Sequence, residues 1–138
     1  MKDEQGFSEN LWLDVLENGK GRQMKLLAAF TYTDKDGMRH TAPRDMVFDG
    51  GSIPRFFWRV IGSPYTGRAR RAYPIHDLEC GLARSAPTLS ERWAMRKGAD
   101  KLLHEMCVFL GVAWWRCAAI YRGVRIGAVS VMKKPANP

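Results

Sequence analysis

Residues 48–55 read Phe-Asp-Gly-Gly-Ser-Ile-Pro-Arg, and they mark the point where the chain changes character. Before this segment, short apolar and β-branched runs alternate with turn residues, a pattern typical of strands. After Pro54, apolar residues recur at intervals of three and four, which is typical of helices. The sequence therefore predicts an α+β protein of one domain, with a β-rich part over residues 9–50 and a helical part over residues 53–130.

The β-rich part contains four extended segments, at residues 11–16, 24–33, 38–41 and 46–48. Asn18-Gly19 follows the first segment and is a strong hairpin signal. Asp34-Lys35-Asp36-Gly37 follows the second and is also typical of a turn. We expect a small antiparallel sheet of three to four short strands, packed on the helices because one face needs cover.

The helical part contains three main helices, preceded by a short apolar segment at residues 53–61 that favours one or two helical turns. The first covers residues 68–82, with Pro74 placed in its first turn or kinking it. The second starts near Glu91 after an N-cap at Thr88 or Ser90 and ends at Gly111. The third covers residues 114–129, and residues 131–138 are expected to form a flexible tail.

The composition is that of a globular protein with an excess of positive charge. The 138 residues carry a formal net charge of +8. This charge favours contact with nucleic acid, lipid headgroups or an acidic partner, and does not choose among them. Arg68, Arg70 and Arg71 form the densest basic cluster and are candidate ligands for an anion such as phosphate.

Three cysteines without a Cys-x-x-Cys spacing indicate reduced thiols rather than a disulfide framework. The polar N-terminus predicts no secretory signal. The apolar stretch from Cys107 to Met132 is interrupted by arginines, so no transmembrane segment is expected.

Asp49, Gly50 and Gly51 lie at the junction between the two parts of the chain. A carboxylate beside two glycines can hold a cation with main-chain carbonyls, or an anion with main-chain amides. It can also be an ordinary turn, and all three interpretations stay open from the residues alone.

His76 and Asp77 stand in an otherwise apolar helix, and Asp100 and His104 share one face of the next. A histidine beside carboxylates suits a general base, or a metal site formed with Asp100 and His104. A buried polar network that only holds the helices together is the alternative.

Four motifs in order resemble the DUF1353 family of phage and prophage proteins: residues 43–55, Ile75-His76-Asp77-Leu78, Gly98-Ala99-Asp100 and residues 121–127. The resemblance spans residues 24–127 and implies a phage-type protein of unknown function. Phe48 stands where that family usually has Thr, and Cys80 where it usually has an aromatic residue. The missing tyrosine hydroxyl weakens any role given to the position of Cys80.

The order of a Gly-rich loop, a His-Asp pair and a later Asp is also similar to small bacterial and fungal phospholipases A2. That similarity implies His76 as general base and Asp100 as the residue that orients it. It further implies a calcium ion held near Asp77 and the loop of Asp49, Gly50 and Gly51. The disulfides of those enzymes are absent here, so the similarity is one of motif order.

Three functions are therefore weighed, and enzymatic activity is left open. The first is a non-catalytic protein of the virion or the host cell cytoplasm that binds a host or virion protein. Its His/Asp residues then belong to a structural network that includes Ser52, Pro54, Arg55, Tyr121 and Arg125. The second is a hydrolase with the phospholipase-like site and its calcium, and the third is a nucleic-acid-binding protein.

Overall fold

The computed structural model describes residues 4–8, 10–16, 23–48 and 67–132. The chain divides into two compact units, Met1–Gly50 and Gly51–Pro138. The described strands all lie in the first unit and the described helices in the second, so the predicted α+β class is confirmed. That the whole chain forms a single domain stays a prediction. The Asn18-Gly19 turn, the short helix at 53–61 and residues 133–138 of the expected tail lie outside the described residues.

In the described residues of the first unit, the strands form two antiparallel sheets of three strands each. One has the order β1-β4-β5, formed by Gly6–Phe7, Phe30–Thr33 and Arg39–Ala42. The other has the order β2-β3-β6, formed by Leu13–Leu16, Gln23–Leu26 and Val47–Phe48. The described strands thus form two small sheets, where the sequence predicted one.

The extended segment expected at residues 24–33 is two strands in different sheets. Leu26 donates its amide to the Met46 carbonyl at 2.9 Å, and Leu27 donates to Trp12 at 3.0 Å, so the first half stays with β2 and β6. The second half pairs with β1 and β5. The apolar composition of the segment does not reveal the break, because both halves have buried residues.

Aromatic side chains form much of the core of the first unit. The ring of Phe7 stacks on Phe30 at 5.4 Å and lies 4.8 Å from the ring of Tyr32. The turn predicted between β4 and β5 is present, with Asp34 Oδ1 accepting from the amides of Asp36 and Met38 at 2.9 Å. Gly37 takes a positive φ of 85° in this turn.

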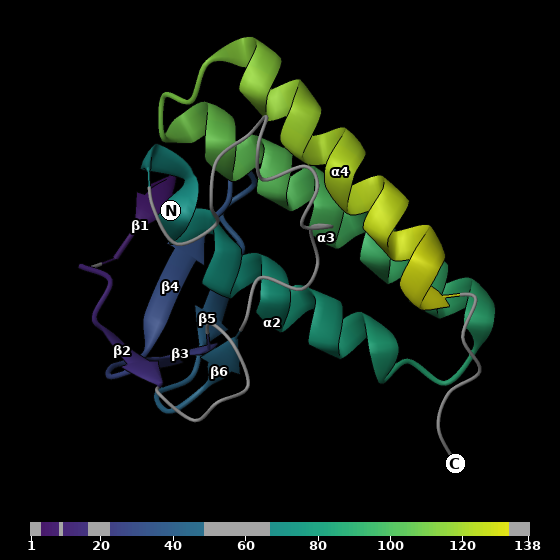
Figure 1. The fold of residues 1–138 in the computed structure, drawn as a ribbon, viewed down its shortest axis with the longest axis horizontal. Helices are drawn as coiled ribbons and strands as arrows, with labels where there is room; N and C mark the ends of the chain where they lie inside the picture. Colours follow the sequence, from purple (N-terminus) through teal and green to yellow (C-terminus); the bar gives the residue numbers. More distant parts are fainter. Residues whose placement is uncertain (1–3, 9, 17–22, 49–66, 133–138) are drawn as a thin grey trace. The chain divides into compact units, whose positions relative to one another are not determined.

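Among the described residues, the second unit holds a short 3₁₀ helix, η2, and three α-helices. These are η2 at Arg68–Arg71, α2 at Ala72–Arg84, α3 at Leu89–Phe109 and α4 at Trp114–Met132. Helix α3 packs against both α2 and α4 and lies between them (Figure 1). The predicted helices are therefore present, with a 3₁₀ turn at the start of the first. Helix α4 continues to Met132, so residues 131 and 132, which were expected in the tail, belong to the helix.

Local signals set the ends of these helices. Pro74 is the third residue of α2, where no intrahelical donor is lost. Thr88 caps α3 by accepting from the amide of Glu91 at 3.1 Å, and Glu91 returns the bond to Thr88. Gly111 follows α3 with φ 75°, and Val112 donates back to Cys107, which completes a Schellman motif.

Each of the described helices α2, α3 and α4 contributes to the core of the second unit. Its buried apolar residues include Ile75, Ala83, Leu103, Met106, Ile120 and Val124. None of the helices in the described part of the chain is long and apolar enough to span a bilayer.

Candidate functional site

His76 of α2 and Asp100 of α3 are in direct contact. The imidazole Nε2 donates to Asp100 Oδ1 at 2.7 Å. Neither side chain has any exposed surface. The pair therefore joins two helices inside the second unit.

Two arginines complete the surroundings of the Asp100 carboxylate. Arg96 lies one turn earlier on α3 and donates from Nε to Oδ1 at 3.0 Å. Arg125 of α4 donates from Nη1 to Oδ2 at 2.7 Å. Arg96 also donates from Nη2 to the Val124 carbonyl at 3.1 Å. One carboxylate thus connects all three helices through charge-assisted hydrogen bonds, which are among the stronger ones in proteins.

These contacts shift the pKa values of both His76 and Asp100. Burial alone would raise the pKa of Asp100, but the hydrogen bond from His76 and the charge of Arg96 hold it below its usual value. Burial alone would lower the pKa of His76, but the hydrogen bond to Asp100 outweighs it and raises that pKa to about 9. Both groups are therefore charged at neutral pH, as an imidazolium facing a carboxylate.

Cys80 lies one turn after His76 on α2, with its Sγ 3.4 Å from the imidazole Nε2. Among the described residues, His76, Cys80 and Asp100 form a group of three potential metal ligands. The 2.7 Å between Nε2 and Oδ1 is a hydrogen-bond distance, whereas ligands of a tetrahedral zinc lie about 3.5 Å apart. Two arginines on the same carboxylate also oppose a cation. This group does not fit zinc, and it lacks the six or more oxygens that calcium takes.

The other residues expected at the site are distributed as follows. Asp77 is half-buried on α2, and its charge contributes to the raised pKa of His76. Tyr121 packs edge-on against His104, with ring centres 5.9 Å apart. His104 is not in the group of potential ligands found among the described residues. Asp49, Gly50, Gly51, Ser52, Pro54 and Arg55 lie outside the described residues.

The sequence reasoning missed Arg96 and Cys80. Each stands four residues from a site residue on the same helix, Arg96 before Asp100 and Cys80 after His76, a spacing that brings side chains together. Arg96 is buried, and a buried arginine requires a partner. Its i,i+4 relation to Asp100 was the signal in the sequence.

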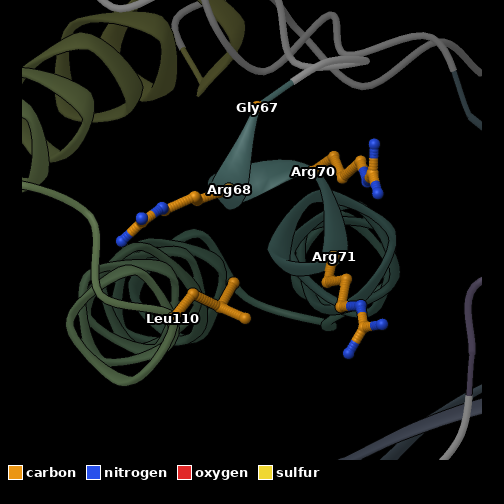
Figure 2. Close-up of a pocket in the computed structure, with 5 residues that line it drawn as sticks. All are labelled: Gly67, Arg68, Arg70, Arg71 and Leu110. Carbon is orange, nitrogen blue, oxygen red and sulfur yellow. The ribbon is translucent and has the colours of Figure 1, made fainter.

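The arginines of η2 lie at a different place on the second unit. Arg68, Arg70 and Arg71 line a hollow of about 410 Å³ together with Gly67 and Leu110. Arg68 donates from Nη1 to the Gly111 carbonyl at 3.2 Å, which ties η2 to the turn after α3. Figure 2 shows Arg68 extending to one side of the hollow and Arg70 and Arg71 to the other. The three guanidinium groups therefore do not converge on one point.

Comparisons with known proteins place the chain among relatives without a described activity. The family model described as "Protein of unknown function (DUF1353)" matches residues 24–124. The uncharacterized protein y4jT of Sinorhizobium fredii is 38% identical over 101 residues, which make up 72% of this chain and 27% of that protein. The match thus spans about a quarter of the length of this curated relative. No solved structure matches the chain significantly.

Proposed function

The chain belongs to the DUF1353 family, which is described as being of unknown function, so we propose its function from the geometry of the site. We propose that the protein is a non-catalytic binding protein in which the His76–Asp100 network holds the helices together. The observation that carries the proposal is that neither His76 nor Asp100 has any exposed surface. The phage or prophage origin, and a place in the virion or the host cytoplasm, are carried over from the family resemblance and belong to the same proposal.

The bonding of Asp100 supports a structural role. Both carboxylate oxygens accept hydrogen bonds, from one residue on each of α2, α3 and α4. A buried polar group satisfied in this way fixes how helices pack. The contacts leave no carboxylate oxygen reserved for a substrate or an ion.

The second candidate is the hydrolase, and the His76–Asp100 hydrogen bond is the observation that favours it. A general base must be neutral to accept a proton, and its pKa works best near the operating pH. Since the pKa of His76 is raised to about 9, the imidazole already carries its proton at neutral pH. Burial also keeps substrate from it. Both facts favour a structural role for His76 over a role as general base.

A paired measurement on wild type and His76→Gln separates the two functions. The first part is the thermal midpoint, and the second is fatty-acid release from phosphatidylcholine vesicles in the presence of calcium. The framework role predicts a lowered midpoint for His76→Gln and no release by wild type. If His76→Gln does not fold, the wild-type assay still decides. Release by wild type that His76→Gln abolishes at an unchanged midpoint would overturn the proposal.

A further inference from the structure

The turn between α3 and α4 exposes a run of apolar side chains. We call residues 108–116, Val-Phe-Leu-Gly-Val-Ala-Trp-Trp-Arg, the hairpin tip. The Trp114 side chain is 82% exposed, and Val108, Phe109 and Trp115 are also exposed. Single exposed apolar residues are ordinary, but a contiguous group at one end of a helical hairpin marks a surface of interaction.

Arginines surround this tip. Arg68, Arg70 and Arg71 of η2 line the hollow beside Leu110, which is itself a tip residue. The guanidinium Cζ of Arg116 lies 5.1 Å from the centre of the Trp115 ring. Neither η2 nor the hairpin tip contains an Asp or Glu. These two segments therefore carry only positive charges.

The arrangement of the arginines indicates what kind of anion they face. Their side chains extend to different sides of the hollow (Figure 2), so one phosphate cannot be clamped by all three. A surface that carries many separate anions can pair with each of these separated guanidinium groups. An anionic bilayer is a surface of this kind, because each headgroup presents its own phosphate.

We propose that the hairpin tip inserts into the interface of an anionic phospholipid bilayer while the η2 arginines contact the headgroups. Trp114 and Trp115 are suited to the interface, where an indole has one apolar and one wet side. The aliphatic and phenyl groups of the tip reach the boundary of the acyl chains. This inference names the partner of the binding protein proposed above, and it rests on that function.

The apolar character of the tip favours lipid over nucleic acid. Protein surfaces that bind nucleic acid are polar and strongly charged, and their aromatic residues stack on bases. Val108, Phe109 and Leu110 would gain nothing from a phosphate backbone. In a bilayer interface these apolar side chains leave water, and the arginines pair with the phosphates of the headgroups.

The test is co-sedimentation with vesicles of phosphatidylcholine alone and of phosphatidylcholine mixed with phosphatidylglycerol. Wild type is expected to bind the mixed vesicles and to be released by salt. Trp114→Ala should weaken binding about tenfold or more, and Arg70→Gln with Arg71→Gln about fivefold for each charge removed. Leu89→Ala, at a leucine 56% exposed at the opposite end of α3, and Arg84→Gln at the other end of α2 are the matched controls and should bind as wild type. All variants change side chains that are exposed or only partly buried. A thermal melt of each variant, compared with wild type, checks that the fold is kept.

Two results would overturn the inference. They are no binding of wild type to anionic vesicles, and equal binding of Trp114→Ala and wild type. Failure of vesicle binding with a lowered midpoint for His76→Gln would reject only the lipid partner. Calcium-dependent ester hydrolysis by wild type that requires His76 would reject the proposed function, whatever the vesicles show.

Discussion

Asp100→Asn removes one negative charge from the buried network and changes almost nothing in size. The asparagine can still accept with its single carbonyl oxygen, but its amide nitrogen then faces a donor. Either the imidazole of His76 or a guanidinium loses its acceptor. The variant therefore tests whether the carboxylate holds the three helices together.

The expected loss follows from the burial of the groups left behind. Arg96 is buried, so its charge would remain inside the protein without a counter-charge. Arg125 is 26% exposed and regains part of its hydration. Removing one partner of a buried ion pair costs about 3–5 kcal/mol. A loss of that size is a large part of the total stability of a small domain, about 5–15 kcal/mol.

Urea denaturation followed by far-ultraviolet circular dichroism measures this loss. Asp36→Asn, at an exposed carboxylate in the β4–β5 turn, is the matched control and should unfold close to wild type. A loss below about 1 kcal/mol for Asp100→Asn would refute the reasoning, because that is the effect of a solvated surface pair.

Further predictions concern the titration of His76, the two ends of α3 and a glycine in its middle. Because the folded-state pKa of His76 is raised from 6.5 to about 9, its stabilising effect is complete below pH 6.5 and is lost as the pH rises through 9. The free energy of unfolding of wild type should fall over that range, and the same titration of His76→Gln should lack this fall. Thr88→Ala should cost about 1 kcal/mol in a urea melt, since the N-cap of α3 loses its acceptor; an unchanged midpoint would contradict the cap. Gly111→Ala should lower the free energy of unfolding by about 1–2 kcal/mol, because φ is 75° and the new Cβ meets Arg68 Nη1 at 3.4 Å. Gly98→Ala, where the new Cβ meets open space, should instead stabilise α3 by about 0.5–1 kcal/mol. Equal effects of the two substitutions would contradict this account.

The sequence by itself determined the elements whose signals are local. The sequence predicted Gly111 at the end of α3 and either Thr88 or Ser90 at its start, because a cap acts within a few residues of the helix terminus. The structure selects Thr88. The placement of Pro74 in the first turn of α2 follows from the same kind of local rule. The motifs also singled out His76 and Asp100 as residues that require partners.

Only the tertiary structure decided which partners those residues have. Arg125 is 25 residues from Asp100 in the chain, and their contact depends on how α4 lies along α3. Likewise, the division of residues 24–33 between two sheets depends on pairing with β1 and β6, whose residues lie far along the chain. Short-range spacing specifies the face a residue takes on its own helix or strand, but it carries no information on the register of packing between elements. For that reason the sequence predicted the helices and the His-Asp motifs, and the arrangement around the Asp100 carboxylate required the folded chain.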